Sequence, residues 1–200
     1  MKKTIFLYFL FSNLIIYSQS PDFSKIKTEL DTVLRYDQLY RLQISDTKRI
    51  YGNNSAEIKN LWDKIKYYDS VNVILVTKII DEFGWLSSDQ IGNNANEALF
   101  LVIQHANLQT QEKYLPTMRQ AVKDKKARGS SLALLEDRIL MRNGKKQLYG
   151  SQIQPNGRGG YEIYPIEDEK NVNIRRAEVG LGKLEDYVRM WDIKYKLPKE

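Results

Sequence analysis

The sequence of 200 residues contains no cysteine and a single histidine, His105. The absence of cysteine excludes disulfide bonds, thiol catalysis, a lipid-modified cysteine, and zinc or iron–sulfur centres that depend on thiolates. With one imidazole, a zinc site would need several carboxylates around His105. We therefore expect no metal and no cofactor, and a fold that is held by its apolar core alone.

The motifs of several functional classes are missing as well. The glycine-rich segment 157–160 lies between two expected strands and lacks the Lys-Ser/Thr pair of a phosphate-binding loop. No segment has the pattern of a nucleophile elbow. The 31 Lys and Arg residues only modestly exceed the 25 Asp and Glu residues, and the basic cluster 123–128 contains no aromatic side chain that could stack on a base. We therefore expect no nucleic acid partner.

A long apolar run occurs only near the N-terminus. Lys2 and Lys3 form a short positive region, the apolar segment 5–16 follows, and small residues flank Gln19, where a signal peptidase could cleave. The run is too short and too interrupted for a comfortable membrane span. We predict a signal peptide at residues 1–20 and an exported protein, periplasmic or secreted, with no other membrane contact. An uncleaved N-terminal anchor is the alternative.

Residues 94–107 are expected to form the central helix of the fold. Six consecutive apolar residues, Ala98 to Ile103, leave this helix no polar face, so it should be buried on most sides. His105 directly follows this run, which places the lone imidazole in or near the interior. The chain from 21 to 200 is long enough to bury this helix as a single domain.

Apolar residues recur at helical spacing over most of the chain. The pattern predicts further helices over 23–45, 56–83, 111–126, 132–141 and within 168–194. The second of these could bend or break near residues 67–70, and Pro116 should lie in the first turn of the third. We expect a mainly α fold of the α+β type, with about six or seven helices around the central one.

The pattern changes to period two between residues 146 and 166. Segments 146–154 and 160–166 alternate around the glycine-rich loop 155–159, which predicts a β-hairpin. Two strands alone are marginally stable, so the hairpin should lie against the helices. Gly150 in the first segment indicates a bulge or a close backbone approach.

Several polar residues fall on apolar helix faces. Asp37 lies on the apolar stripe of the first predicted helix, and Arg41 follows one turn later, a spacing that allows an ion pair. Asn72 is on the inward side of the second helix. Asp137 has apolar residues one turn away on both sides, so its carboxylate should be paired in the interior or have a shifted pKa.

Our first hypothesis is a polar pocket around His105 that binds a small polar or anionic ligand, with hydrolysis as one option. His105 would be the acid–base group, and Asp137 or Asp37 would orient it. Arg175 and Arg176 point about 100° apart on a helix, so one of them would hold negative charge. The candidate ligand-binding residues are Gln38, Arg41, Asn72, Gln104, Gln147, Tyr149, Gln152, Arg175 and Arg176.

The alternative hypothesis is a non-catalytic structural or interaction module. In this case the same polar residues would form a buried hydrogen-bond network that fixes the hairpin on the helices. The two hypotheses differ in geometry. A solvent-open pocket beside His105 favours the first, whereas a sealed and fully hydrogen-bonded network favours the second.

A set of motifs resembles an uncharacterised bacterial family, a domain of unknown function. The motifs are Gly84-Trp85, Gly92, Gln104-His105-Ala106, Leu135-x-Asp137-Arg138, Gly144-x-x-Gln147-x-Tyr149-Gly150-Ser151-Gln152, Pro165-x-x-Asp168 and Arg175-Arg176-x-x-x-Gly180-Leu181. The resemblance covers about residues 69–187, with a weaker match at Asp37-Gln38-x-x-Arg41 and Asn72. Leu86 and Ser151 replace the family's usual Pro and Thr. The resemblance implies no activity, but it marks these polar residues as the family's characteristic set.

Overall fold

The computed structural model describes residues 22–198, which form a mainly helical protein with one two-stranded antiparallel sheet. The predicted signal peptide, residues 1–20, lies outside this range. Within it, no helix is both long enough and apolar enough to cross a bilayer. The predicted fold class is therefore confirmed for the described part of the chain.

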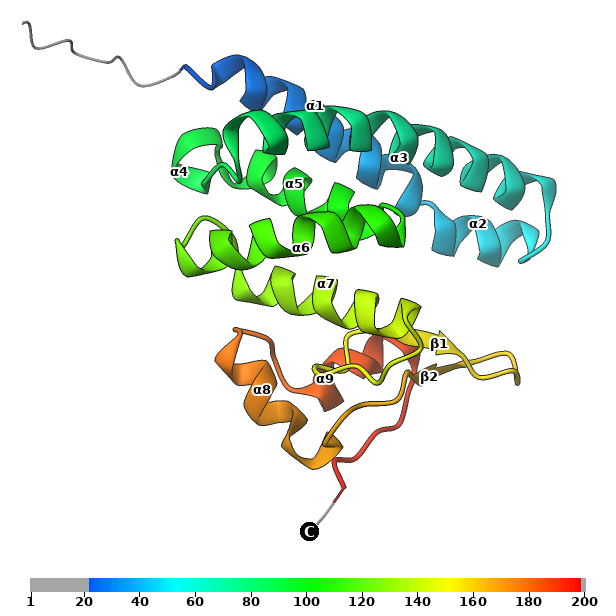
Figure 1. The fold of residues 1–200 in the computed structure, drawn as a ribbon. Coiled ribbons are helices and arrows are strands. Elements are labelled where there is room, and N and C mark those ends of the chain that lie inside the picture. The colour runs from blue at the N-terminus through cyan, green and yellow to red at the C-terminus, as the bar shows by residue number, and fades with distance from the viewer. Residues whose placement is uncertain (1–21, 199–200) are drawn as a thin grey trace, which may run out of the picture.

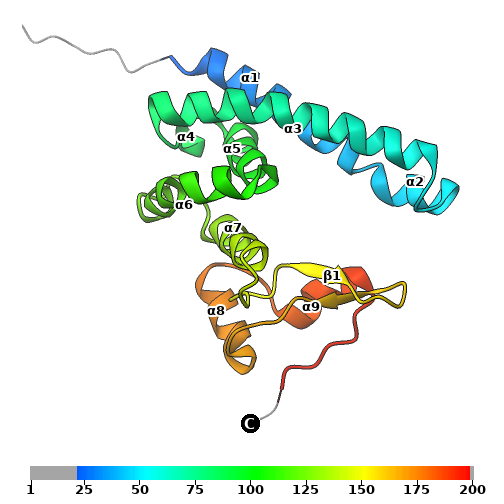
Figure 2. The same ribbon diagram turned by 45° about the vertical axis from the view of Figure 1, so that its right-hand side comes forward.

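The first part of the described chain consists of helices only, and Figure 1 shows how they are layered. Their bounds are α1 Ser24–Arg41, α2 Ile44–Tyr51, α3 Ala56–Phe83, α4 Ser88–Ile91, α5 Asn93–His105, α6 Leu108–Lys123 and α7 Gly129–Arg142. Helices α1 and α3 lie side by side and both pack on α5. Figure 2 shows α5, α6 and α7 following below them in chain order.

The central helix was predicted almost to its ends. Helix α5 carries a core of fully buried residues that contact α1, α3, α6 and α7, among them Ala98, Leu99 and Ile103. Its apolar run explains this position, because a helix without a polar face lowers its free energy only when neighbours cover it on most sides. His105 is the last residue of α5, and its side chain is 17% exposed.

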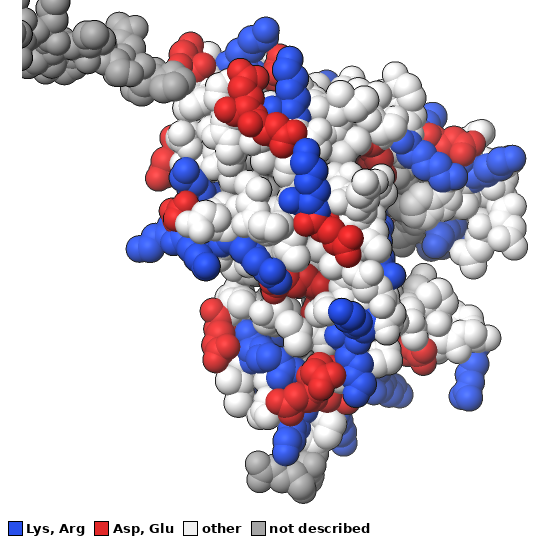
Figure 3. Space-filling view, in the orientation of Figure 1, with Lys and Arg blue, Asp and Glu red and all other residues white. Residues whose placement is uncertain are grey.

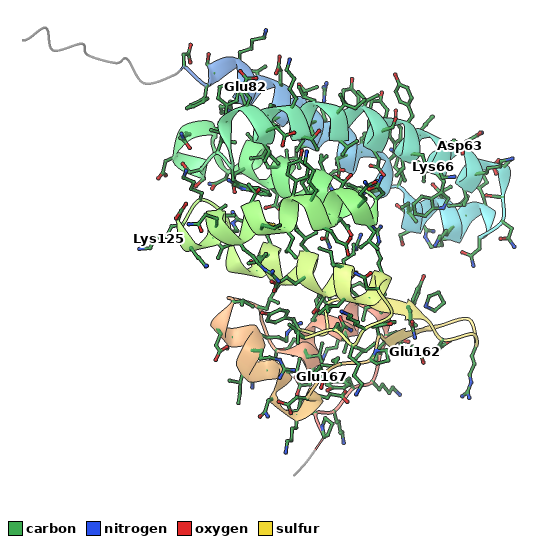
Figure 4. The ribbon with its side chains drawn as sticks, in the orientation of Figure 1. Asp63, Lys66, Glu82, Lys125, Glu162 and Glu167 are labelled. Atoms are coloured by element: carbon green, nitrogen blue, oxygen red, sulfur yellow. The ribbon has the colours of Figure 1, made fainter. Side chains whose placement is uncertain are left out.

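Helix α3 begins and ends as predicted but does not break. The Ser55 side chain accepts a hydrogen bond from the Ile58 amide at the N-terminus, and Gly84 ends the helix with φ +70°. Between them, 28 residues form one continuous helix. In Figure 4, Asp63 and Lys66 lie at the end of α3 near α2, and Glu82 lies at the other end. Tyr68, in the predicted break, instead stacks on Tyr36 of α1 at a ring distance of 4.6 Å.

Two other helix boundaries differ from the prediction. The first predicted helix, 23–45, ends at Arg41, and a short turn leads into α2. Helix α6 begins three residues before its predicted start, because the Asn107 side chain accepts a hydrogen bond from the Thr110 amide. Pro116 therefore lies inside the helix and not in its first turn. It is exposed, so the carbonyl that loses its amide donor can face water.

The C-terminal part packs against α7, on the side away from α1 and α3 (Figures 1 and 2). Its elements are β1 Ile153–Pro155, β2 Tyr161–Ile163, the 3₁₀ turn Glu169–Asn171, α8 Val172–Glu178, α9 Leu184–Val188 and the 3₁₀ turn Arg189–Trp191. A second small core, built on Ile166, Val172, Leu184 and Val188, holds it together. Acidic and basic side chains are interspersed on the face shown in Figure 3.

The hairpin is shorter than predicted. The strands pair Ile153 with Ile163 and Pro155 with Tyr161, so only three residues on each side belong to the ladder. Residues 147–152, predicted as strand, form a loop with one isolated bridge to the other segment, between Gln147 and Ile166. The Gln152 carbonyl also accepts the Tyr164 N–H. The reason is that the Asp137 carboxylate accepts the backbone N–H groups of this loop, which are then not available to a sheet.

Gly150 lies at a close backbone approach, as its position in the sequence indicated. Its φ is +70°, and an added Cβ would lie 2.9 Å from methyl groups of both Ile166 and Leu184. Both the backbone conformation and the lack of space therefore require glycine.

We predict that Gly150→Ala lowers the free energy of unfolding by about 2–4 kcal/mol, from left-handed strain plus overpacking. Gly157→Ala is the matched control, because Gly157 has φ +71° but no atom within 4 Å of an added Cβ. It should lose only the backbone component, about 1–2 kcal/mol. Urea unfolding measures both, and equal losses for the two variants would contradict the crowding at Gly150.

Candidate functional site

The predicted polar residues form separate groups on different faces of the helices. Helix α7 lies between the helical bundle and the C-terminal part, and every second residue from 131 to 139 is buried. Arg138 faces the end of α5, whereas Asp137 faces the loop 147–152. The His105 group and the Asp137 group are therefore described one after the other.

His105 pairs with Asp37. The imidazole Nδ1 lies 2.9 Å from Asp37 Oδ1, and the side chain of Asp37 is 1% exposed. The second carboxylate oxygen accepts a hydrogen bond of 2.7 Å from the Gln38 amide. A buried carboxylate thus orients the only imidazole in the chain, an arrangement typical of a histidine that transfers protons.

Arg41 joins this pair to a second carboxylate. Its Nη2 donates to both oxygens of Asp69 on α3, at 2.8 and 2.9 Å. Its Nε faces the imidazole, 3.2 Å from Nδ1 and 3.4 Å from Nε2 of His105, and lies 3.9 Å from Asp37 Oδ2. The predicted ion pair along α1 is therefore present, but Asp69 is the closer partner of the guanidinium.

These contacts determine which nitrogen of His105 carries the proton. A guanidinium N–H cannot donate to a nitrogen that itself carries hydrogen, so Arg41 and Asp37 cannot both bond to the same ring nitrogen. In the neutral form that satisfies this condition, Nδ1–H donates to Asp37, and Nε2 is the ring acceptor that faces the guanidinium. In this form Nε2 is the ring nitrogen that carries no hydrogen, and the Arg41 Nε lies 3.4 Å from it.

The two carboxylates have pKa values shifted in opposite directions. Burial alone would raise the pKa of Asp37, but the His105 hydrogen bond, the charges of His105 and Arg41 and the Gln38 amide outweigh it, so the pKa lies below its usual range. Burial raises the pKa of Asp69, and Arg41 and His105 only partly oppose this effect. Asp37 is therefore the firmly ionised partner of the imidazole.

A cavity of about 290 Å³ opens beside this group. Its lining combines Arg41, His105 and Arg138 with the apolar side chains of Ile44 and Trp62. The residues come from α1, α2, α3, α5 and α7, so the site exists only once these helices have packed together. Trp62 is 39% exposed, and this marks the solvent side of the cavity.

Arg138 is held in place from two sides. Its Nε donates to the Gln152 side chain at 3.1 Å, and its Nη1 donates to the backbone carbonyl of Gln104 at 3.3 Å. Burial, with the nearby Arg142 guanidinium, lowers the pKa of Arg138 to about 10, so the group stays charged at neutral pH. Among the described residues, no acceptor bonds to Nη2 of Arg138 or Nη1 of Arg41, which leaves both donors available to a ligand.

Asp37, Asp69 and His105 each bring one possible metal-ligand atom, and these atoms lie within 4.8 Å of one another. The cationic guanidinium of Arg41 already binds both oxygens of Asp69 and lies against the imidazole. A metal ion could use this triad only if Arg41 moved away. The residues present therefore fit an internal ion pair better than a metal site.

The structure does not bring Asp137 to His105. Asp137 is fully buried, and its two oxygens accept the backbone N–H groups of Leu148, Tyr149 and Ser151 at 2.7 to 3.2 Å. The prediction that Asp137 could orient His105 is not supported by this placement. Its carboxylate instead fixes the loop 147–152 on α7.

The other candidates of the C-terminal part belong to the same network. Gln147 is fully buried. Its side-chain nitrogen donates to the carbonyls of Gln152 and Tyr164, and its side-chain oxygen accepts the backbone N–H of Gln152. Arg176 donates to the carbonyls of Tyr149 and Gly182. This network is sealed, and it ties the hairpin and α8 to the loop.

Arg175 also binds backbone. It donates to the carbonyls of Leu148, Glu167 and Asp168, and its Nη1 lies 3.3 Å from the Asp168 carboxylate. Neither member of the Arg175–Arg176 pair lines the cavity beside His105. Tyr149 enters the network through its backbone alone, and only Gln152 reaches across to Arg138.

Two further candidates lie apart from the cavity. Gln104 donates to the Leu134 carbonyl and is 4% exposed, so it contributes its backbone oxygen to Arg138 and not its side chain to the pocket. Asn72 lines a different, apolar hollow between α1 and α3.

Sequence reasoning missed four residues of the site, namely Ile44, Trp62, Asp69 and Arg138. Asp69 fell in the expected break of 56–83, although it precedes Asn72 by three residues and thus shares its face of a continuous helix. Arg138 was part of a recognised motif but had no assigned role. Ile44 and Trp62 look like ordinary core residues, and no signal in the sequence singles them out.

The fold and the site define a mainly helical protein with a His–Asp pair beside a guanidinium-lined cavity. The family model of the family of unknown function DUF6624 matches residues 21–199. The chain therefore belongs to this family, which agrees with the resemblance to a domain of unknown function. No curated protein and no solved structure matches it.

We predict that Asp137→Ala lowers the free energy of unfolding by about 3–5 kcal/mol, since it leaves several buried N–H groups without an acceptor. Glu136→Ala on the same helix is the control, because Glu136 is only partly buried and its ion pair with the half-exposed Arg119 should contribute about 1 kcal/mol. Urea unfolding measures both variants. A cost for Asp137→Ala no larger than that for Glu136→Ala would contradict the anchoring role of Asp137.

The lowered pKa of Asp37 predicts a pH-dependent contribution to stability. A carboxylate with a folded-state pKa below its unfolded value stabilises the fold above the unfolded pKa, and this contribution is lost as the pH falls through the folded pKa. The difference in unfolding free energy between the wild type and Asp37→Asn should therefore be constant at neutral pH and shrink below about pH 4. The raised pKa of Asp69 has the opposite effect on stability, but Asp69 is present in both proteins, so its contribution to the difference largely cancels.

Urea unfolding at a series of pH values measures this difference. Asp46→Asn serves as the control, because its carboxylate pairs with Arg49 on the surface with 71% of the side chain exposed. An Asp37→Asn difference that stays constant down to pH 3 would show that the Asp37 carboxylate is not stabilised in its ionised form.

Proposed function

We propose that the protein binds a small anionic ligand in the cavity beside His105 and that His105 transfers a proton to or from it. The carrying observation is that the only imidazole of the chain pairs with a buried carboxylate and lines an open cavity between two guanidinium groups. The predicted signal peptide would deliver this activity outside the cytoplasm.

The charges of the cavity support an anionic ligand. Asp69 and Asp37 compensate Arg41, whereas the partners of Arg138 in the described part of the chain are neutral, namely Gln152 and the Gln104 carbonyl. The two guanidiniums also repel each other, since Arg41 contributes to the lowered pKa of Arg138. An anion between their available N–H groups would remove this repulsion and accept charge-assisted hydrogen bonds.

The lining also supports a reaction class. Its residues include no hydroxyl or thiol nucleophile. A hydrolytic reaction here would use water: Nε2 of His105 takes a proton from the water, whose oxygen attacks an ester of the bound anion, and the proton passes to the leaving alcohol. Asp37 holds the ring and stabilises the imidazolium, and Arg138 fixes the anionic group. Ile44 and Trp62 would contact the apolar part of the ligand.

One observation supports the structural alternative. Asp137, Gln147 and Arg176 are buried and hydrogen-bond to backbone groups, as expected of residues that hold the fold together. These three side chains are not accessible to a ligand. We assign this structural role to the C-terminal network and the ligand-binding role to the His105 cavity.

We predict that inorganic phosphate or acetate, added at constant ionic strength, shifts the NMR signals of the His105 imidazole saturably. The chain has one histidine, so these signals have no overlap. Arg138→Gln removes a charged donor and should weaken binding about ten- to hundredfold.

Arg119→Gln is the control, because Arg119 pairs with Glu136 and does not line the cavity. It should leave the anion affinity unchanged. Hydrolysis of 4-nitrophenyl phosphate and 4-nitrophenyl acetate, with His105→Gln as the comparison, tests the reaction class separately. The binding proposal fails if neither anion shifts the His105 signals or if Arg138→Gln binds as tightly as the wild type.

A further inference from the structure

A second hollow lies between α1 and α3, one helical turn from the His105 group. Its volume is about 360 Å³, within the range of small-molecule sites. The wall includes the apolar side chains of Val33, Val71 and Leu75 and the tyrosines 36 and 68. Asn72 from α3 completes it, and we call it the α1–α3 hollow.

Stacked aromatic side chains form part of the wall of this hollow. Tyr36 and Tyr68 stack with an interplanar angle of 5°, and Tyr68 stacks on Tyr40 as well. The Arg35 guanidinium lies 4.8 Å from the centre of the Tyr36 ring. A ligand therefore meets preformed aromatic side chains, so little conformational entropy is lost on binding.

Asn72 is the polar group that points to a ligand. The residue is 5% exposed and lines the hollow, and its buried Nδ2 has no hydrogen-bond partner among residues 22–198. An amide nitrogen buried without an acceptor costs about 1–3 kcal/mol. The cost would be recovered if the side chain turned its amide toward a bound molecule that placed an acceptor atom against it. No residue of the His105 site uses Asn72, so the group is otherwise unexplained.

The charges around the hollow restrict the ligand. Glu29 is the one charged residue of the lining, so an anionic head group would be repelled. The remaining wall is mostly apolar, and Val71 stays 46% exposed beside it. The matching molecule is apolar, neutral and small, and it carries one hydrogen-bond acceptor such as a ketone, ester or amide oxygen.

We propose that the α1–α3 hollow is a second ligand site, which binds a small neutral apolar molecule through a carbonyl oxygen hydrogen-bonded to Asn72. It is independent of the anion site at His105. The two ligands differ in chemistry, since one is held by guanidiniums and the other by an apolar wall and an amide.

The test uses prodan, a neutral naphthalene ketone whose emission shifts to the blue in an apolar site. We expect saturable binding with a blue shift, and movement of the Asn72 side-chain amide signals in the NMR spectrum. Asn72→Leu should weaken binding at least fivefold while the protein remains as stable as the wild type or more so, because the substitution removes an unpartnered polar group. A structural role for Asn72 would instead lower the stability.

Thr32→Trp fills the hollow from the exposed side of α1 and should abolish prodan binding. Thr117→Trp on α6 is the matched control, and His105→Gln separates this site from the anion site; both should bind prodan as the wild type does. Unchanged affinity in Thr32→Trp or in Asn72→Leu overturns the proposal. So does a dimer in sedimentation experiments that Thr32→Trp dissociates, because a second copy of the chain would then occupy the hollow.

Discussion

The carboxylate of Asp137 is the interaction on which both halves of the molecule depend. By accepting three backbone amides of the loop 147–152, it joins the C-terminal part to α7. The loop in turn positions Gln152, whose side chain accepts the Arg138 guanidinium beside His105. A sealed structural network thus sets the geometry of an open site one residue further along α7. The residue groups on which the two hypotheses rest lie on different faces of one helix.

At the site itself, opposite charges are arranged around one imidazole. Asp37 on α1 orients the ring, and Arg41, bound to Asp69, lies against it. This internal ion pair occupies the position where a metal would otherwise bind the same carboxylates. The charge that remains uncompensated belongs to Arg138, on the far wall of the cavity.

Periodicity predicted the elements but not their partners. The ends of α3 and the burial of α5 follow from local signals, namely a Ser cap, a glycine stop and an unbroken apolar run. The predicted hairpin was too long, because no local sequence pattern reveals the hydrogen bonds of Asp137. Its carboxylate accepts backbone N–H groups of the loop that begins eleven residues later, near Leu148. His105 and Asp37, both singled out from the sequence, lie together in the structure. Asp69 and Arg138 were not singled out, since their contacts with this group join helices distant in sequence.

The unbroken course of α3 has a consequence for how the chain can vary. Its 28 residues span about 42 Å, and each residue advances the helix face by about 100°. Trp62, Asp69 and Asn72 lie on this one helix at intervals of seven and three residues. The helix therefore fixes the direction in which the cavity lining points relative to the lining of the hollow. One residue inserted between Trp62 and Asp69 would turn the lining of one site away from the other. An insertion in this part of α3 would therefore change how the cavity and the hollow face each other, because residues of the same helix line both.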